Sequence, residues 1–236
     1  MKASVVVPAF NEERLLAGSL AAMREAMHAF DDAGWASELI VCDNNSSDRT
    51  AEIAREAGAA VVFEPVNQIA RARNAGAAHA SGDWLVFVDA DSYPDSRLFL
   101  EVLQTVKSGR TIGGGATVAF EIDDVAVRAA LAAWNALSRA AKWAAGSFIF
   151  CEAAAFRELG GFSESLYAAE EIDFSRRLKR LGRVVILHRH PLHTSDRKVH
   201  LYTWREHLAF LWRMLTGGRR TLRSRDACSV WYDGRR

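Results

Sequence analysis

The stretch WLVFVDADS, residues 84–92, is the most informative part of the sequence. It begins with an unbroken run of apolar, β-branched and aromatic residues, which is the pattern of a buried β-strand. It ends with two carboxylates, Asp89 and Asp91, and residues two apart in an extended segment point to the same side. Oxygen ligands of this kind suit Mg²⁺ or Mn²⁺, which also bind phosphate oxygens. The same residues fit a strand end followed by an acidic turn, so this stretch alone leaves both interpretations open.

Strand and helix patterns alternate on the N-terminal side of this stretch. Apolar runs at residues 4–7, 38–43 and 61–63 predict strands, and helical patterns follow them at 11–30, 49–57 and 69–80. This alternation predicts an α/β fold with a mostly parallel central sheet and helices on both faces.

Polar side chains follow three of the predicted strands. Asn11 and Glu13 follow the first strand, Asp43 ends the second, and Asp89 and Asp91 follow the fourth. Ligands of parallel sheets bind beyond the carboxyl ends of the strands. One polar strand end is commonplace, but three at the same edge predict a binding site.

Several motifs occur in an order and at separations that resemble the family 2 glycosyltransferases of GT-A fold. They are VVVPAFNEE (5–13), DNNSSDRT (43–50), ARNAG (72–76), DAD (89–91) and, further on, GGF (160–162) with EE (170–171). The resemblance extends from residue 4 to about 182. It implies one Rossmann-like GT-A domain at 1–200, with a nucleotide-binding half at 1–92 and an acceptor-side half at 93–200. Beyond it, the charge and the apolar spacing of residues 201–236 predict a basic, Trp-rich C-terminal amphipathic helix and tail.

The resemblance also implies a site for a donor nucleotide. Its residues would be Pro8, Ala9, Asn11, Glu13, Asp43, Asn45, Arg73, Asn74 and Asp89, with Arg197 and Lys198 contacting the diphosphate. Carboxylates accept hydrogen bonds from base N–H groups and sugar hydroxyls, and a guanidinium binds phosphate oxygens through two parallel bonds. A solvated helix face is the alternative interpretation for Arg73.

The cofactor implied by the resemblance is Mg²⁺ or Mn²⁺, held by Asp91 and Asp89. Such an ion offsets the charge that develops on the leaving nucleoside diphosphate. Four histidines at 188, 190, 193 and 200 suggest zinc at first sight, but a DxD site needs hard oxygen ligands more than imidazoles. Some GT-A enzymes take a further ligand from this region, and His193 is the candidate here.

Two acids at the start of a predicted helix, Glu171 and Asp173, are candidates for the catalytic base. Carboxylates in a first turn are also favoured by the helix dipole, so a purely structural role is open. The related enzymes usually have Glu-Asp here and use the second acid as base when they invert configuration, which points to Glu171. Two residues apart on a helix, these side chains point about 200° from each other. Asp173 would instead pair with Arg176 or Arg177, three and four residues further on.

The C-terminal quarter has a charge opposite to that of the rest. Residues 1–175 contain 14 Lys or Arg and 25 Asp or Glu, whereas residues 176–236 contain 16 and 4. A predicted amphipathic helix at 202–215 either docks on the catalytic domain or lies at an anionic membrane surface. The basic tail could equally neutralise the acidic body or meet an anionic substrate.

Three widely spaced cysteines indicate a reducing compartment. Neither a signal peptide nor an apolar run long enough to span a membrane is visible in the sequence. We therefore expect a cytoplasmic protein, peripheral on the membrane if the tail binds lipid, and no nucleic-acid partner.

The resemblance implies a metal-dependent, inverting glycosyltransferase. It would move a sugar from a UDP- or GDP-sugar to an unidentified hydroxyl acceptor, which is a polysaccharide, a lipid-linked molecule or a small molecule. A phosphatase-like hydrolase is one alternative, with the first Asp of Asp-x-Asp as nucleophile, although it favours Thr or Val where Tyr93 stands. A non-catalytic sugar-nucleotide-binding or membrane-docking protein is the other.

Overall fold

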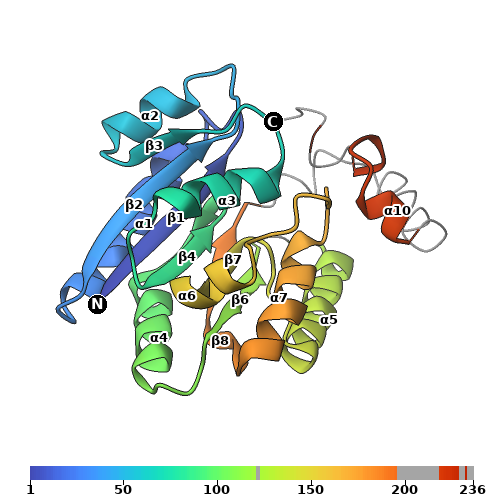
Figure 1. Ribbon diagram of the computed structural model, residues 1–236. Helices are drawn as coiled ribbons and strands as arrows, with labels where there is room; N and C mark the ends of the chain where they lie inside the picture. The colour runs from blue at the N-terminus through green and yellow to red at the C-terminus, as the bar shows by residue number, and fades with distance from the viewer. Residues whose placement is uncertain (121–122, 196–217, 229–231, 233–236) are drawn as a thin grey trace.

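A computed structural model describes residues 1–120, 123–195, 218–228 and Tyr232. A mixed, mostly parallel sheet forms the centre of the molecule, with the strand order β3-β2-β1-β4-β7-β6-β8-β5 (Figure 1). Its strands are β1 (Lys2–Ala9), β2 (Ala36–Asp43), β3 (Ala60–Phe63), β4 (Trp84–Val88), β5 (Ser92–Tyr93), β6 (Gly113–Ala119), β7 (Phe148–Glu152) and β8 (Val184–Thr194). The predicted α/β architecture is confirmed.

Helices cover both faces of this sheet (Figure 1). They are α1 (Leu16–Asp31), α2 (Thr50–Glu56), α3 (Ile69–His79), α4 (Ser96–Lys107), α5 (Val125–Ala141), α6 (Ala153–Glu158), α7 (Glu170–Leu181) and the short α10 (Arg219–Leu222). Among the described residues, none of these helices has the length and hydrophobicity needed to span a membrane.

Alternation along β1 divides the core into two layers. Val5 and Val7 belong to the cluster that includes α1 and α4, whereas Val6 belongs to the cluster that includes α3, α6 and α7. A central parallel strand is buried on both faces, which explains its continuous apolar run. Helix α3 approaches this strand so closely that a Cβ at Gly76 would stand 2.5 Å from Val6 Cγ1. The ARNAG motif is thereby held near the carboxyl end of the sheet.

The sheet changes character after β4. Strand β7 runs antiparallel to both β4 and β6, while β6 and β8 are parallel. The glycine run at 113–115 lies where neighbouring backbone and small side chains come close, as its sequence predicted. A Cβ at Gly113 would stand 2.5 Å from Phe150 O, and one at Gly115 would stand 2.6 Å from Ala144 Cβ.

Two boundaries differ from the sequence-based expectation. Helix α1 begins at Leu16 rather than near residue 11, because Asn11 has a left-handed backbone (φ 52°) and belongs to a loop. Strand β8 continues to Thr194 instead of ending at Leu187, because its second half pairs with β5 and with the end of β6. His188, His190 and His193 therefore lie on a strand.

The described part of the C-terminal segment returns to α3. Cys228 and Tyr232 form a buried cluster with Ala168, against which Ile69 and Leu222 pack. The predicted amphipathic helix at 202–215 lies outside the described residues, as do Arg197 and Lys198. All three cysteines are buried and form no disulfide.

Candidate active site

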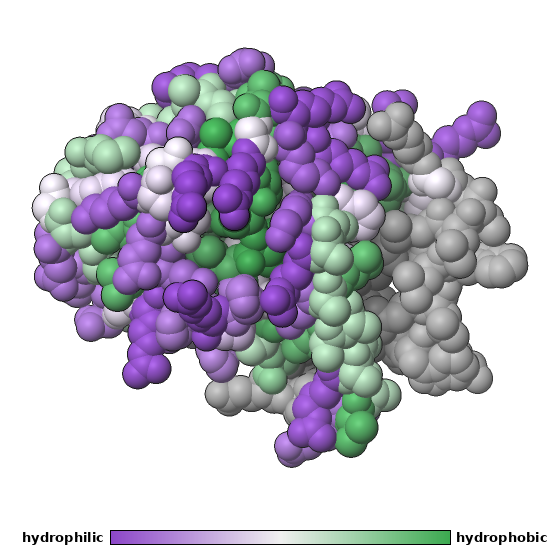
Figure 2. All heavy atoms as spheres, turned by 90° about the horizontal axis from the view of Figure 1, so that it is seen from below, coloured by the Kyte–Doolittle hydropathy of each residue, from purple (hydrophilic) through white to green (hydrophobic). Residues whose placement is uncertain are grey.

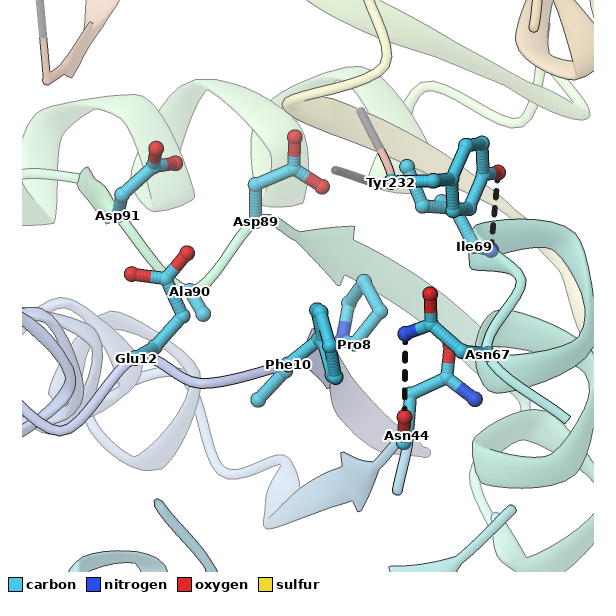
Figure 3. A pocket seen from close by; sticks show the side chains of 11 residues that line it. Pro8, Phe10, Glu12, Asn44, Asn67, Ile69, Asp89, Ala90, Asp91 and Tyr232 are labelled. Carbon is cyan, nitrogen blue, oxygen red and sulfur yellow. Dashed lines mark hydrogen bonds between the residues drawn. The ribbon is translucent and has the colours of Figure 1, made fainter. Parts of the chain in front are cut away.

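The loops that follow β1, β2 and β4 surround a pocket at the carboxyl edge of the sheet. It is lined by Pro8, Ala9, Phe10, Glu12, Asn44, Asn67, Ile69, Asp89, Ala90, Asp91 and Tyr232 (Figure 3). Ala9 and Asp43 are paired neighbours in the parallel ladder of β1 and β2, which is why the two loops leave the sheet together. The structure thus brings Pro8, Ala9, Asp89 and Asp91 into one pocket.

Several of the expected donor residues shape these loops instead of lining the pocket. The side-chain oxygen of Asn11 accepts a hydrogen bond from Ser47 N at 2.8 Å, and Asp43 Oδ1 accepts one from Ser46 N at 3.0 Å. Glu13 is exposed and accepts a hydrogen bond from Arg49 N at 3.3 Å. Asn45 is exposed with a left-handed backbone.

Two residues that the sequence analysis did not single out take the inward positions. Asn44 is buried, and its side chain bridges to Glu64 O, Val66 O and Gln68 N while it lines the pocket. Glu12 is buried too, and Figure 3 shows its carboxylate and that of Asp91 pointing into the same side of the pocket. The left-handed turn at Asn11 is what redirects the chain so that Glu12 faces inward.

Asp89 and Asp91 occupy different environments. Residues 89–91 form a turn after β4, with Ser92 N donating to Asp89 O, so the same-side geometry of an extended segment does not apply. The side chain of Asp89 is 27% exposed and its Oδ1 accepts a hydrogen bond from Arg73 Nη2 at 3.0 Å. Asp91 is 7% exposed and, unlike Asp89, lies beside Glu12 (Figure 3).

The donor set beside Asp91 fits Mg²⁺ or Mn²⁺. Glu12 and Asp91 offer hard carboxylate oxygens, and magnesium is usually bound by one or two carboxylates together with water and substrate phosphates. The described residues contain no group of three or more His, Cys, Asp or Glu that would hold a metal by themselves. His193 is exposed on β8 opposite Tyr93 and does not line the pocket.

Arg73 joins the loop after β4 to the start of α7. Its guanidinium is 2% exposed and donates to Asp89 Oδ1, to Glu170 Oε1 at 2.8 Å and to Gly146 O at 2.7 Å. Burial disfavours this charge, but the carboxylates of Asp89, Glu170 and Glu171 outweigh burial and raise the pKa of Arg73. The solvated-face interpretation of Arg73 is therefore wrong. Asn74, next to it, binds the backbone of Phe162 and lies away from these pockets.

A second pocket continues from Asp89 past Arg73 to Glu171. It has a volume of about 160 Å³ and is lined by residues of α3, of the 146–147 loop and of the segment from Tyr167 to Glu171. Glu171 is half-buried here. Burial and the neighbouring charges of Glu170 and Asp89 raise the pKa of Glu171 to about 8, although Arg73 opposes them.

Asp173 points elsewhere. Its Oδ2 accepts a hydrogen bond from Arg177 Nε at 2.7 Å, the i,i+4 pair that the sequence predicted as its alternative role. Arg177 also donates to Leu159 O and Gly161 O, so this pair fastens α7 to the end of α6. Glu171 lines the second pocket, whereas Asp173 lines neither this pocket nor the one at the strand ends.

A third and larger pocket opens on the other side of Asp89. Its volume is about 420 Å³, and it lies between α5, the end of β6 and the loop that precedes β7. Asp89 lines all three pockets, and Asp91 lines two of them. Ser195, the last described residue before 218, donates its N–H to Asp91 O at the mouth of this pocket.

Known proteins share this sequence pattern and this architecture. The model of glycosyl transferase family 2 matches residues 4–158. The chain is 33% identical over 125 residues to the probable glycosyltransferase YdaM of Bacillus subtilis (strain 168), which covers 48% of this chain and 29% of that protein. It is 31% identical over 125 residues to a dolichol-phosphate mannosyltransferase of Pyrococcus furiosus, and this match covers 49% of this chain and 33% of that protein. The aligned part thus spans a third or less of these relatives' length.

Solved structures show the same fold. The mannosyltransferase PcManGT from Pyrobaculum calidifontis, in complex with GDP-Man and Mn²⁺, superposes with a TM-score of 0.69 at 18% identity, covering 94% of this chain and 62% of that one. The Staphylococcus aureus TarS structure of residues 1–349 gives a TM-score of 0.67 at 18% identity, covering 89% and 64%. Together with the family match over residues 4–158, the ordered motifs and the mixed sheet establish that this chain belongs to glycosyl transferase family 2 and has the GT-A fold.

Proposed function

We propose that this protein transfers a sugar from a nucleoside-diphosphate sugar to a hydroxyl acceptor, with inversion at the anomeric carbon. The observation that carries the proposal is the position of Asp89 and Arg73 between a carboxylate-lined pocket at the strand ends and the pocket that holds Glu171. A donor bound in the first pocket would place its sugar next to Glu171, the candidate general base, in the second pocket. Similar folds are known in complex with UDP, UDP-GlcNAc, UDP-Glc and GDP-Man, which supports this class of donor.

Different residues of the chain would bind the donor, hold the cation and accept the proton. The loops at Pro8–Glu12 and Asn44 would enclose the nucleotide, and Asp91 with Glu12 would hold Mg²⁺ or Mn²⁺ beside the diphosphate. When bound, the cation neutralises charge on the departing diphosphate. Glu171 would accept the proton of the acceptor hydroxyl as that oxygen attacks the anomeric carbon. Arg73 positions Asp89 and Glu170, and Asp173 fixes α7 through Arg177.

The structure gives less support to the two alternative functions. A phosphatase-like hydrolase would use Asp89 as nucleophile, yet one oxygen of this carboxylate is held by the buried Arg73, which lowers its nucleophilicity. A binding protein without catalysis has no need for a half-buried acid with a raised pKa at the pocket wall. The expected contacts of Arg197 and Lys198, and of the basic residues 201–236 with an anionic membrane, stay predictions.

A thermal-shift comparison tests the proposal. UDP or GDP together with Mn²⁺ should raise the melting temperature, because a ligand that binds only the folded state stabilises it by mass action. Asp91→Asn should remove the Mn²⁺-dependent part of the shift and leave the melting temperature of the unliganded protein nearly unchanged, because a neutral amide is a poor cation ligand. Hydrolysis of p-nitrophenyl phosphate, or a shift in Asp91→Asn that still depends on Mn²⁺, would count against the assignment.

A further inference from the structure

We propose that the acceptor is an amphiphile whose hydrocarbon chain binds in the large pocket between α5 and β6. This inference rests on the proposed transferase function and narrows its acceptor to a lipid-like molecule. The reacting hydroxyl would lie at the end of the pocket nearest Asp89, and the chain would extend from there along α5.

The pocket has a polar end and an apolar body. Asp89, Asp91, Ser147, Thr194 and Ser195 line the end that faces the other two pockets. The body is lined by Val118, Phe120, Val127, Ala130, Leu131 and Trp134. Its volume of about 420 Å³ is within the range of pockets that enclose whole small ligands.

This division of polarity favours an alkyl chain over a second sugar. A sugar would turn hydroxyl groups toward Val127, Leu131 and Phe120, which have no hydrogen-bonding side-chain atoms, and burial without a partner is costly. Asn135, on the same side of α5, is already engaged, since its side chain accepts from Val118 N and donates to Val118 O. Methylene groups lose no hydrogen bond in such surroundings and gain from leaving water.

The outer face of α5 is suited to a lipid surface. Val125 is 69% exposed and Leu137 is 49% exposed, and alanines occupy most of the face between them. The only charged residues of this helix are Arg128 and Arg139. In Figure 2 an apolar band crosses an otherwise largely hydrophilic face of the molecule where α5 lies. An apolar face flanked by arginines fits an interface with anionic lipid, from which an amphiphilic acceptor would enter the pocket beneath.

Titration calorimetry with a matched pair of ligands tests the chain site. We expect n-decyl β-D-glucopyranoside, below its micelle concentration, to bind the chain of 236 residues. Methyl β-D-glucopyranoside, which has the same head group without the alkyl chain, should not bind. Ala130→Trp fills the pocket from an exposed position of α5 and should weaken decyl glucoside binding by about tenfold or more. Val127→Asp places a charge in the apolar body and should do the same.

The matched control is Ala136→Trp, which adds the same side chain at an exposed position about 120° around the helix from Ala130 and about 180° from Val127. It should leave the affinity for decyl glucoside unchanged. Equal loss in Ala130→Trp and Ala136→Trp, or no binding of decyl glucoside to the wild type, would overturn the proposal. The Mn²⁺-dependent thermal shift with UDP or GDP, recorded on the same samples, reports the fold and the donor site separately. Its absence from the wild type would refute the transferase assignment, while the calorimetry would still decide whether the pocket holds a chain.

Discussion

The pocket at the strand ends and the pocket under α5 are built in different ways. The first is shaped by loops whose conformation depends on individual hydrogen bonds, such as those of Asn11 and Asn44 to neighbouring backbone. The second is formed by the apolar side of a helix and the end of a strand. A hydrogen-bonded loop needs one residue type at one place, whereas an apolar wall accepts many residues of similar size. We therefore expect substitutions in the loops of the strand-end pocket to impair function, whereas the wall of the pocket under α5 should tolerate exchanges between apolar residues of similar size.

The two pockets meet at Asp89, and Glu171 lies in the pocket next to this junction. We expect the rate of sugar transfer to depend most on Glu171. Glu171→Gln should lower kcat by about 10²–10⁴, because the amide cannot accept the acceptor proton, while nucleotide affinity stays nearly unchanged. Single-turnover rates together with UDP or GDP binding measure the two quantities separately.

Asp173→Asn is the matched control on the same turn of α7. Its ion pair with Arg177 is partly exposed, so we expect a loss of about 1 kcal/mol or less in stability and nearly normal turnover. A folded but inactive Asp173→Asn, together with a fully active Glu171→Gln, would show that the roles of the two acids are reversed.

Arg73 links α3 to the loop after β4 and to the start of α7, and its removal should have the largest effect on stability. Arg73→Leu would leave Glu170 and Asp89 without their cation, and breaking a buried ion pair typically costs about 3–5 kcal/mol. Arg71→Leu, on the same helix, breaks only the partly exposed pair with Glu164 and should cost about 0–1 kcal/mol. Urea denaturation of both variants measures the difference in the free energy of unfolding, and equal losses would mean that the buried ion pairs of Arg73 contribute no more than the exposed pair of Arg71.

The raised pKa of Glu171 predicts that stability falls and turnover rises over the same pH interval. The ordinary pKa of a glutamate is 4.5, and in the folded protein that of Glu171 is about 8, so between these values the folded state binds more protons than the unfolded state. The contribution of Glu171 to stability is therefore complete below about pH 4.5 and is lost as the pH rises to 8. A general base must be ionised, so turnover should rise over the upper part of the same interval.

The stability of Glu171→Gln, compared with that of the wild type at two pH values, tests this prediction. At pH 8 the variant should be more stable than the wild type, by on the order of 1–3 kcal/mol, because its neutral amide replaces a carboxylate that the site disfavours. At pH 4.5 the two proteins should unfold alike. A variant that is less stable than the wild type at pH 8 would show that Glu171 is held as a stable anion.

The sequence predicted the sheet better than the site. Apolar runs ending in polar residues were enough to place β1, β2 and β4, because a strand buried on both faces has to be apolar throughout. The pocket-facing residues were harder to predict, since Asn11, Glu12 and Glu13 are all polar and only the left-handed backbone at Asn11 decides which of them turns inward. Asn44 and Asn45 present the same ambiguity. That Tyr232 lines the pocket at the strand ends could not be predicted, because this position depends on where the C-terminal segment packs.

The attachment of α5 has a consequence for how such an enzyme changes over time. Asn135 binds both backbone groups of Val118, and Leu131 and Trp134 pack against the core, so these three side chains attach the helix to the sheet. Val127 and Ala130 take no part in that attachment and can be exchanged without disturbing the strand-end loops, Arg73 or Glu171. A lineage that keeps Asn135 can acquire new acceptors by substitutions within a single helix, and directed evolution of acceptor preference should begin there.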